Sequence, residues 1–294
     1  MNPKLSGVFI PIVTPFKEQK VNLEMLASNI EKSNSTPVAG YMPLGSNGEF
    51  IHMDDEEQLA VFRTVRKNAG KDKVIMVGIA RQSAYCTIEF GKRIQDEGAD
   101  FFSVLCPSYF ASAMTDAALI RYYSAVADSL SVQVLLYNCP KFAAGVTLSP
   151  LVVKELSKHP NIAGMKDTSS GNIEKYLEVK ESGFEVVAGS IENYLLGLIS
   201  GASGGVLSMA NYLPEPCCRI QELFIAGRIE EAKELSGKLI NLNKGAAGKF
   251  GVAGVKAACD MFGYKGGEVR NPLADCTETQ KESIRHAFFE NGYL

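Results

Sequence analysis

The chain has 294 residues, of which 46% are hydrophobic and 21% charged, and its formal net charge is −3. This balance argues against nucleic-acid binding, which normally needs a basic surface, and no apolar run reaches the ~18 residues of a membrane span. Seven cysteines without a Cys-x-x-Cys pair argue against a disulfide framework or a structural zinc site. We therefore expect reduced thiols and a cytoplasmic protein with no nucleic-acid or membrane partner.

Short apolar runs, separated by stretches with helical spacing, recur from the N-terminus to about residue 207. The runs are nearly continuous rather than alternating, which is typical of parallel strands covered on both faces. We expect strands at 7–13, 39–44, 74–79, 101–105, 132–137, 162–166, 185–188 and 204–207. Eight strands alternating with helices predict an α/β fold, a (β/α)8 TIM barrel. An open doubly wound sheet would need a Gly-x-Gly-x-x-Gly fingerprint, which the sequence lacks.

The residues after 213 show helical spacing and no further strand. We expect helices at about 215–226, 229–243, 252–262 and 278–290. The sequence thus predicts a barrel over 1–213 and a helical extension over 214–294, packed on the barrel as part of a single structural unit. No linker, low-complexity tract or internal repeat divides the chain.

The carboxyl ends of the strands carry the candidate reactive groups, because the active sites of such barrels lie at that end. Lys166 ends an apolar strand, where burial would lower its pKa and leave amine free to attack a ketone. Tyr137 occupies the corresponding position on the preceding strand, where a phenol can relay protons. The alternatives are a lysine that extends into solvent and a tyrosine that only lines the barrel.

A glycine-rich turn follows the second expected strand. Gly45 and Gly48 flank Ser46 and Asn47, so backbone N–H groups and a hydroxyl can converge on an anion at the start of a helix. The alternative is a tight turn that only caps the helix.

Four motifs in this order resemble the dihydrodipicolinate synthase / N-acetylneuraminate lyase superfamily, from about residue 7 to the C-terminus. The motifs are Pro11-x-x-Thr14-Pro15-Phe16, Gly45-Ser46-Asn47-Gly48-Glu49, Tyr137-Asn138-x-Pro140 and Gly164-x-Lys166-Asp167. The resemblance implies a class I, pyruvate-dependent aldolase on a (β/α)8 barrel, with a small 2-oxo acid as its ligand and neither a cofactor nor a metal.

The resemblance also implies roles for individual residues. Lys166 would form the Schiff base, Tyr137 would transfer protons, and Ser46 would pass protons to Tyr137. Tyr109 would complete this relay from a neighbouring subunit, so a homotetramer (a dimer of dimers) is expected. Ser46 and Asn47 would hold the carboxylate of the pyruvyl unit. The remaining substrate-binding candidates are Thr168, Gly189, Leu207 and Phe142.

The expected reaction is cleavage of a 4-hydroxy-2-oxo acid to pyruvate and an aldehyde. The sequence is most similar to 4-hydroxy-2-oxoglutarate aldolases, which release glyoxylate, and to 2-keto-3-deoxy sugar-acid aldolases. The first alternative is 4-hydroxy-tetrahydrodipicolinate synthase. Such synthases have an arginine that binds the carboxylate of the aldehyde substrate, and this chain has Phe142 at that position. The second is N-acetylneuraminate lyase, which has an aspartate where this chain has Ile191.

The sequence is compatible with three other kinds of protein. A metal-dependent aldolase would need clustered ligands, and His52, His159 and His286 lie in unrelated parts of the sequence. A phosphate-binding barrel could use Gly189-Ser190 and Gly204-Gly205, although small residues there can equally make room for a substrate. The third alternative is a barrel that binds a 2-oxo acid but does not catalyse a reaction. Glu49 is a possible substrate ligand, or a carboxylate at a helix start.

Overall fold

The computed structural model describes residues 2–169 and 171–294. Eight strands follow one another in the order of a closed barrel, β1-β10-β9-β8-β7-β6-β5-β4, which confirms the predicted (β/α)8 fold with additional C-terminal helices. The chain divides into two units. The first contains the residues up to Gly7 together with Val74–Val206, and the second contains Val8–Lys73 together with Leu207–Leu294.

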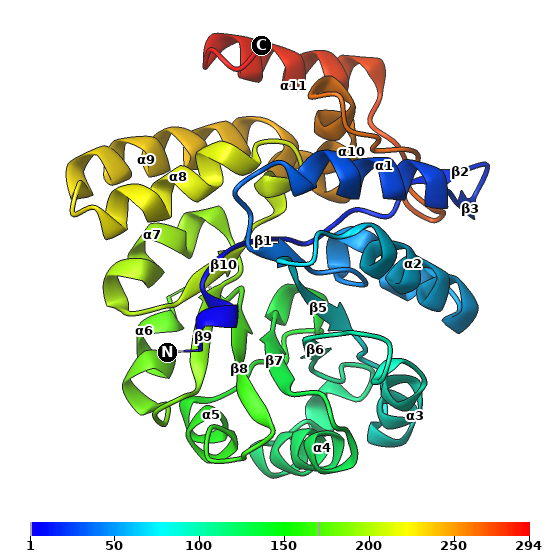
Figure 1. The fold of residues 1–294 in the computed structure, drawn as a ribbon, viewed down its shortest axis with the longest axis vertical. Helices are drawn as coiled ribbons and strands as arrows, with labels where there is room; N and C mark the ends of the chain where they lie inside the picture. Colours follow the sequence, from blue (N-terminus) through cyan, green and yellow to red (C-terminus); the bar gives the residue numbers. More distant parts are fainter. Residues whose placement is uncertain (1, 170) are drawn as a thin grey trace. The chain divides into compact units, whose positions relative to one another are not determined.

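The first unit is a run of alternating strands and helices. Its strands pair in parallel, each with the next along the chain, and Figure 1 shows the helices on the outside of these strands. The strands are β5 (Val74–Gly78), β6 (Phe101–Leu105), β7 (Val134–Asn138), β8 (Ile162–Asp167), β9 (Glu185–Ala188) and β10 (Gly204–Val206). The helices are α3 (Ala84–Ile94), α4 (Asp116–Ser129), α5 (Pro150–Leu156), α6 (Ile173–Val179) and α7 (Ile191–Ser200).

Strands β6, β7 and β8 are buried along their whole lengths, as the continuous apolar runs predict for parallel strands covered on both faces. Gly164 lies in β8, two residues before Lys166. A Cβ at this position would lie 2.3 Å from the carbonyl oxygen of Glu185 in β9. Glycine therefore lets β9 approach β8 closely just before the strand ends.

In the second unit, β1 (Gly7–Ile10) and β4 (Gly40–Tyr41) pair in parallel. Both are shorter than expected. Pro11 follows β1 and has no N–H to donate to a ladder, and Leu44 has a left-handed backbone with φ of 59°. The helices that precede and follow β4 are α1 (Leu23–Asn34) and α2 (Asp55–Asn68).

The structure contains a short hairpin that the sequence did not predict. Strands β2 (Phe16–Lys17) and β3 (Lys20–Val21) pair antiparallel, and the two turn residues, Glu18 and Gln19, both have positive φ. Two-residue turns of this kind normally use asparagine or glycine, so Glu-Gln gave no turn signal.

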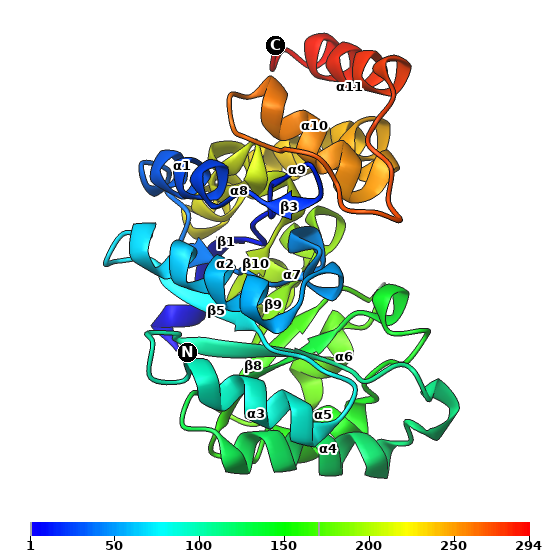
Figure 2. The ribbon, with the colours of Figure 1, turned by 90° about the vertical axis from the view of Figure 1, so that its right-hand side faces the viewer.

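The chain ends in the four helices that the spacing predicts. They are α8 (Pro214–Ile225), α9 (Ile229–Gly245), α10 (Gly251–Met261) and α11 (Glu278–Glu290). Figure 1 shows α8 and α9 side by side, and Figure 2 shows α10 next to α11. Rings of Tyr212, Phe262 and Phe288 pack together with centroids 4.9–6.1 Å apart, which attaches α11 to the end of α10. A domain boundary at residue 213 stays a prediction.

Single 3-10 turns occupy several connections. They are η1 (Pro3–Leu5), η2 (Ser46–Gly48), η3 (Phe50–His52), η4 (Ala111–Ala113), η5 (Pro140–Phe142), η6 (Ser208–Asn211) and η7 (Ala247–Phe250). Two of these turns, η2 and η5, lie in the connections that follow β4 and β7 and carry residues that the sequence predicts for the site.

Candidate active site

Lys166 is the penultimate residue of β8, and its side chain is almost wholly buried, with 5% of the residue exposed. Burial lowers the pKa of its amine to about 8, while the neighbouring Cys139 thiol acts weakly in the opposite direction. Removal of the ammonium from water disfavours the charged form. A fraction of the Lys166 amine is therefore neutral at the carboxyl end of β8.

Tyr137 stands directly beside Lys166. The two residues are register partners on the adjacent strands β7 and β8, and Nζ of Lys166 lies 4.1 Å from the centroid of the Tyr137 ring. Tyr137 is also 5% exposed. The phenol and the amine, which the sequence places at corresponding strand positions, thus lie against one another in a site from which most water is excluded.

Thr168 and Gly189 follow the ends of β8 and β9. The Thr168 hydroxyl is buried and, within the part of the chain that the structure describes, has no hydrogen-bond partner. A Cβ on Gly189 would lie 2.4 Å from that hydroxyl oxygen, and the Gly189 N–H donates to the carbonyl of Asp167 at 2.6 Å. The glycine is thus needed for close packing of the two strand ends. Its contact with substrate, and that of Thr168, stays a prediction.

Phe142 and Tyr109 are exposed. Phe142 ends η5 and is 52% exposed, with Nζ of Lys141 5.8 Å from its ring centroid. Tyr109 is 81% exposed and packs edge-on against Phe110, while its backbone N–H donates to the side chain of Gln82. An exposed phenol is available to another subunit, but the role of Tyr109 across an interface stays a prediction.

Ser46, Asn47 and Leu207 belong to the second unit. The Ser46 hydroxyl is buried and has no hydrogen-bond partner among the described residues, which leaves it available to a ligand. Asn47 donates to the Ser208 hydroxyl at 2.6 Å. Leu207 is fully buried, and its N–H donates to the carbonyl of Phe9 at 3.0 Å. Their place beside Lys166 stays a prediction.

Glu49, a possible substrate ligand from its place in the sequence, is bound on both carboxylate oxygens by protein groups. One oxygen lies 2.6 Å from Nζ of Lys256 in α10, and the other accepts the Arg270 N–H at 3.0 Å and contacts Nδ1 of His52 at 3.3 Å. Glu49 and Lys256 are 2% and 1% exposed. The carboxylate therefore anchors the Ser46–Gly48 turn to the C-terminal helices and is not presented to a ligand.

Each of the three histidines contacts a different carboxylate. His52 contacts Glu49, His159 lies 3.0 Å from Asp128, and His286 lies 3.1 Å from Glu290. Among residues 2–169 and 171–294, no group of three or more His, Cys, Asp or Glu side chains is arranged to hold a metal ion. In the same ranges, no helix combines the length and the apolar composition that crossing a membrane requires.

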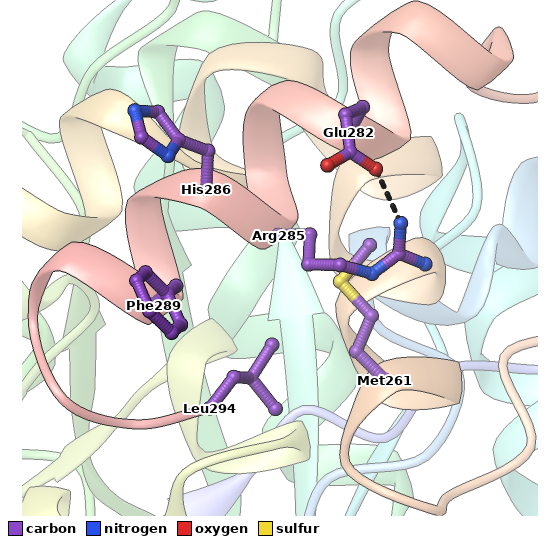
Figure 3. A pocket seen from close by; sticks show the side chains of 6 residues that line it. All are labelled: Met261, Glu282, Arg285, His286, Phe289 and Leu294. Atoms are coloured by element: carbon purple, nitrogen blue, oxygen red, sulfur yellow. Dashed lines mark hydrogen bonds and ion pairs between the residues drawn. The ribbon is translucent and has the colours of Figure 1, made fainter.

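A pocket of about 480 Å³ lies at α10, α11 and the C-terminal residue (Figure 3). None of the predicted site residues lines it. Its charged side chains engage partners on their own helix, because Glu282 pairs with Arg285 and His286 with Glu290. Its lining residues are Met261, Glu282, Arg285, His286, Phe289 and Leu294.

The model of the dihydrodipicolinate synthetase family matches residues 4–290. A protein of Emericella nidulans named probable mitochondrial 4-hydroxy-2-oxoglutarate aldolase is 33% identical over 299 residues, which cover 98% of this chain and 96% of that one. A 4-hydroxy-tetrahydrodipicolinate synthase of Caldicellulosiruptor saccharolyticus is 30% identical over 293 residues, covering 99% and 98%.

Solved structures have the same fold. A crystal structure of a dihydrodipicolinate synthase is similar with a TM-score of 0.90 at 27% identity, covering 98% of this chain and 100% of that chain. A dihydrodipicolinate synthase from Thermotoga maritima has a TM-score of 0.93 at 24% identity, covering 99% and 100%.

Proposed function

Since this chain belongs to the dihydrodipicolinate synthetase family and is a carbon–carbon lyase, we propose that Lys166 forms a Schiff base with a 2-oxo acid. One observation carries the proposal: the buried Lys166 amine lies 4.1 Å from the centroid of the Tyr137 ring. Because burial lowers the pKa of this amine to about 8, roughly a tenth of it is neutral at pH 7. The neutral amine is the nucleophile that attacks a ketone.

The reaction then runs as a retro-aldol cleavage. The Lys166 amine adds to the C2 ketone of a 4-hydroxy-2-oxo acid. Tyr137 then donates its proton to the carbinolamine hydroxyl, which leaves as water, so that a protonated imine and the Tyr137 phenolate remain. Tyr137 takes the proton of the C4 hydroxyl, the C3–C4 bond breaks, and its electron pair moves into the imine to form an enamine while the aldehyde leaves. Protonation of C3 and hydrolysis of the imine release pyruvate and regenerate the amine.

Ser46 and Asn47 are proposed to hold the substrate carboxylate, and Thr168 to bond a substrate hydroxyl or a second carboxylate. The buried hydroxyls of Ser46 and Thr168, which have no partner among the described residues, support these roles. A buried polar group without a hydrogen bond is costly, so a ligand that supplies the missing bond gains affinity. Gly189, Leu207 and Phe142 complete the proposed substrate-binding set.

We favour 4-hydroxy-2-oxoglutarate as the substrate, with glyoxylate as the aldehyde product, and a 2-keto-3-deoxy sugar acid as the related choice. The name of the Emericella nidulans relative and the Ser46-Asn47 pair support this choice. A second candidate, 4-hydroxy-tetrahydrodipicolinate synthase, is favoured by the name of the Caldicellulosiruptor relative. Against it stands Phe142, because a synthase would use an arginine there to grip the carboxylate of its aldehyde substrate.

Incubation with pyruvate and borohydride tests the Schiff base. We expect irreversible inactivation and a pyruvyl mass on the peptide that contains Lys166, since reduction converts the imine into a stable amine. Peptide mass spectrometry locates the adduct, and borohydride without pyruvate is the control. An adduct on another lysine, or no adduct, would refute the proposal.

A substrate panel tests the choice of aldehyde. We expect kcat/KM for cleavage of 4-hydroxy-2-oxoglutarate to exceed that for condensation of pyruvate with aspartate semialdehyde by at least about tenfold, because no bidentate guanidinium stands at position 142. The panel includes 2-keto-3-deoxygluconate and N-acetylneuraminate. Phe142→Arg should raise the synthase activity relative to the wild type. The choice is wrong if the wild type prefers aspartate semialdehyde.

We also propose a cytoplasmic homotetramer. The exposed pair Tyr109 and Phe110, at 81% and 70% exposure, supports an interface at this loop. Six of the seven cysteines are buried, and all seven are unbridged, which supports a reducing compartment.

A further inference from the structure

A second pair of residues lies directly behind Tyr137 and Lys166. Asn138 follows Tyr137 in β7, Asp167 follows Lys166 in β8, and these two are also register partners. Successive side chains of a strand point to opposite faces. Asn138 and Asp167 therefore face away from the reactive pair, toward the outer side of the strands, where both are 0% exposed.

The two side chains form a direct bridge, because Nδ2 of Asn138 donates to Oδ1 of Asp167 at 2.8 Å. The orientation of the amide is fixed by its other partners. The N–H of Leu148 donates to Oδ1 of Asn138 at 3.0 Å, and a backbone N–H can only donate, so the nitrogen must face Asp167. The second amide hydrogen is donated to the hydroxyl of Tyr176 at 3.1 Å.

Among the residues that the structure describes, the hydrogen bonds of the Asp167 side chain all go to one of its two carboxylate oxygens. Oδ1 accepts from Asn138 and also from the N–H and hydroxyl of Ser169, at 3.1 and 2.7 Å. Oδ2 is buried and has no hydrogen-bond partner within the described residues. Burial raises the pKa of this carboxyl, and the bonds from Ser169 and Asn138 oppose that rise. An acceptor oxygen, rather than a full carboxylate, is what the bridge requires.

On the basis of the proposed Schiff-base function, we propose that the Asn138–Asp167 bridge positions Lys166 against Tyr137. The bridge ties the last residue of β7 to the last residue of β8, at the register pair next to the reactive one. A displacement of about 1 Å between reacting groups can cost about 10²-fold in rate. Asn138 and Asp167 are therefore positioning residues that act through the strand ends, without touching the substrate.

Two isosteric substitutions separate this role from a role of charge. Asn138→Asp sets two carboxylates against each other and breaks the bridge. Asp167→Asn retains an acceptor at Oδ1 and places its amide nitrogen at the position of Oδ2, which has no partner among the described residues. This variant therefore keeps the bridge while removing the charge. Asn161→Asp is the matched control, because Asn161 precedes β8 and donates to the carbonyls of Ala127 and Leu130 at 2.9 and 2.7 Å.

The readout is the rate of Lys166 adduct formation with pyruvate and borohydride, together with the half-saturating pyruvate concentration. We expect Asn138→Asp to slow adduct formation at saturating pyruvate by about 10²-fold, with a change in half-saturation below about threefold. Asp167→Asn should retain at least about a third of the wild-type rate. Asn161→Asp should lower the melting temperature but leave the rate within about threefold of wild type.

Three results would overturn the positioning role: a near-normal rate in Asn138→Asp, an equal loss in Asp167→Asn, or an equal loss in Asn161→Asp. If Asn138→Asp does not fold, Asn138→Ala removes the amide without adding charge and carries the same expectation. Failure of the proposed function is recognised separately, because the wild type would then form no Lys166 adduct.

Discussion

Replacement of Lys166 by methionine is expected to abolish catalysis and, at the same time, to stabilise the protein. Loss of a covalent nucleophile lowers kcat on the order of 10⁶-fold in well-studied enzymes, and we expect cleavage of every panel substrate to fall below detection. Methionine fills a similar volume without a charge. It removes the cost of keeping an amine in a buried site, where 5% of the residue is exposed.

The stabilisation depends on pH in a defined direction. Burial lowers the pKa of Lys166 from 10.5 to about 8 in the folded state, so the unfolded chain binds more protons between these two values. The contribution of this lysine to stability therefore rises with pH between about 8 and 10.5 and is at its most unfavourable below 8. The advantage of Lys166→Met is then roughly 3 kcal/mol below pH 8 and disappears toward pH 10.5.

Thermal or denaturant unfolding of both proteins between pH 7 and 9.5 measures this difference. Lys154→Met, at an exposed lysine of α5, is the control and should change neither the activity nor the melting temperature. If Lys166→Met is less stable than the wild type at pH 7, burial of the Lys166 amine does not destabilise the folded protein. Residual Schiff-base activity in the variant would remove Lys166 from the mechanism.

The pairing of Tyr137 with Lys166 on adjacent strands could be predicted from the sequence because it depends on local pattern. An apolar strand that ends in lysine, next to one that ends in tyrosine, requires only that consecutive strands pair in parallel and that each side chain alternates in direction. The observed register partners Tyr137 and Lys166 confirm this. The same rule applied one residue further would have found Asn138 and Asp167, which appear in the motifs but received no role.

Other features depend on contacts that a sequence pattern does not encode. The partner of Glu49 is Lys256, which lies 207 positions away in the sequence. The sequence therefore shows a carboxylate next to the Ser46–Gly48 turn but does not show which cation pairs with it. Gly189 is required because the end of β8 lies close to it, and a Cβ at position 189 would clash with the Thr168 hydroxyl. The β2–β3 hairpin has neither asparagine nor glycine in its turn, and its two-residue strands are too short for a periodic signal.

The Lys256–Glu49 pair is expected to hold the second unit together. Lys256→Met should lower the free energy of unfolding by about 3–5 kcal/mol, because it leaves the Glu49 carboxylate buried and unpaired by its cation. It also removes the donor to the carbonyl of Glu268, 2.6 Å from Nζ. The double variant Glu49→Gln/Lys256→Met should recover at least half of the loss, since neutral groups of similar size remove the need for a counter-charge. Urea unfolding of the single and double variants measures both values.

Lys238→Met provides the matched control, because Lys238 forms a solvent-exposed pair with Glu234 four residues earlier in α9. Exposed pairs contribute little once water and salt screen them, so this variant should unfold at the wild-type denaturant midpoint. Burial lowers the pKa of Lys256 despite the attraction of Glu49, which indicates that desolvation is the larger effect on the cation. A double variant as unstable as Lys256→Met alone would contradict the account, because the loss would then come from packing rather than from an uncompensated charge.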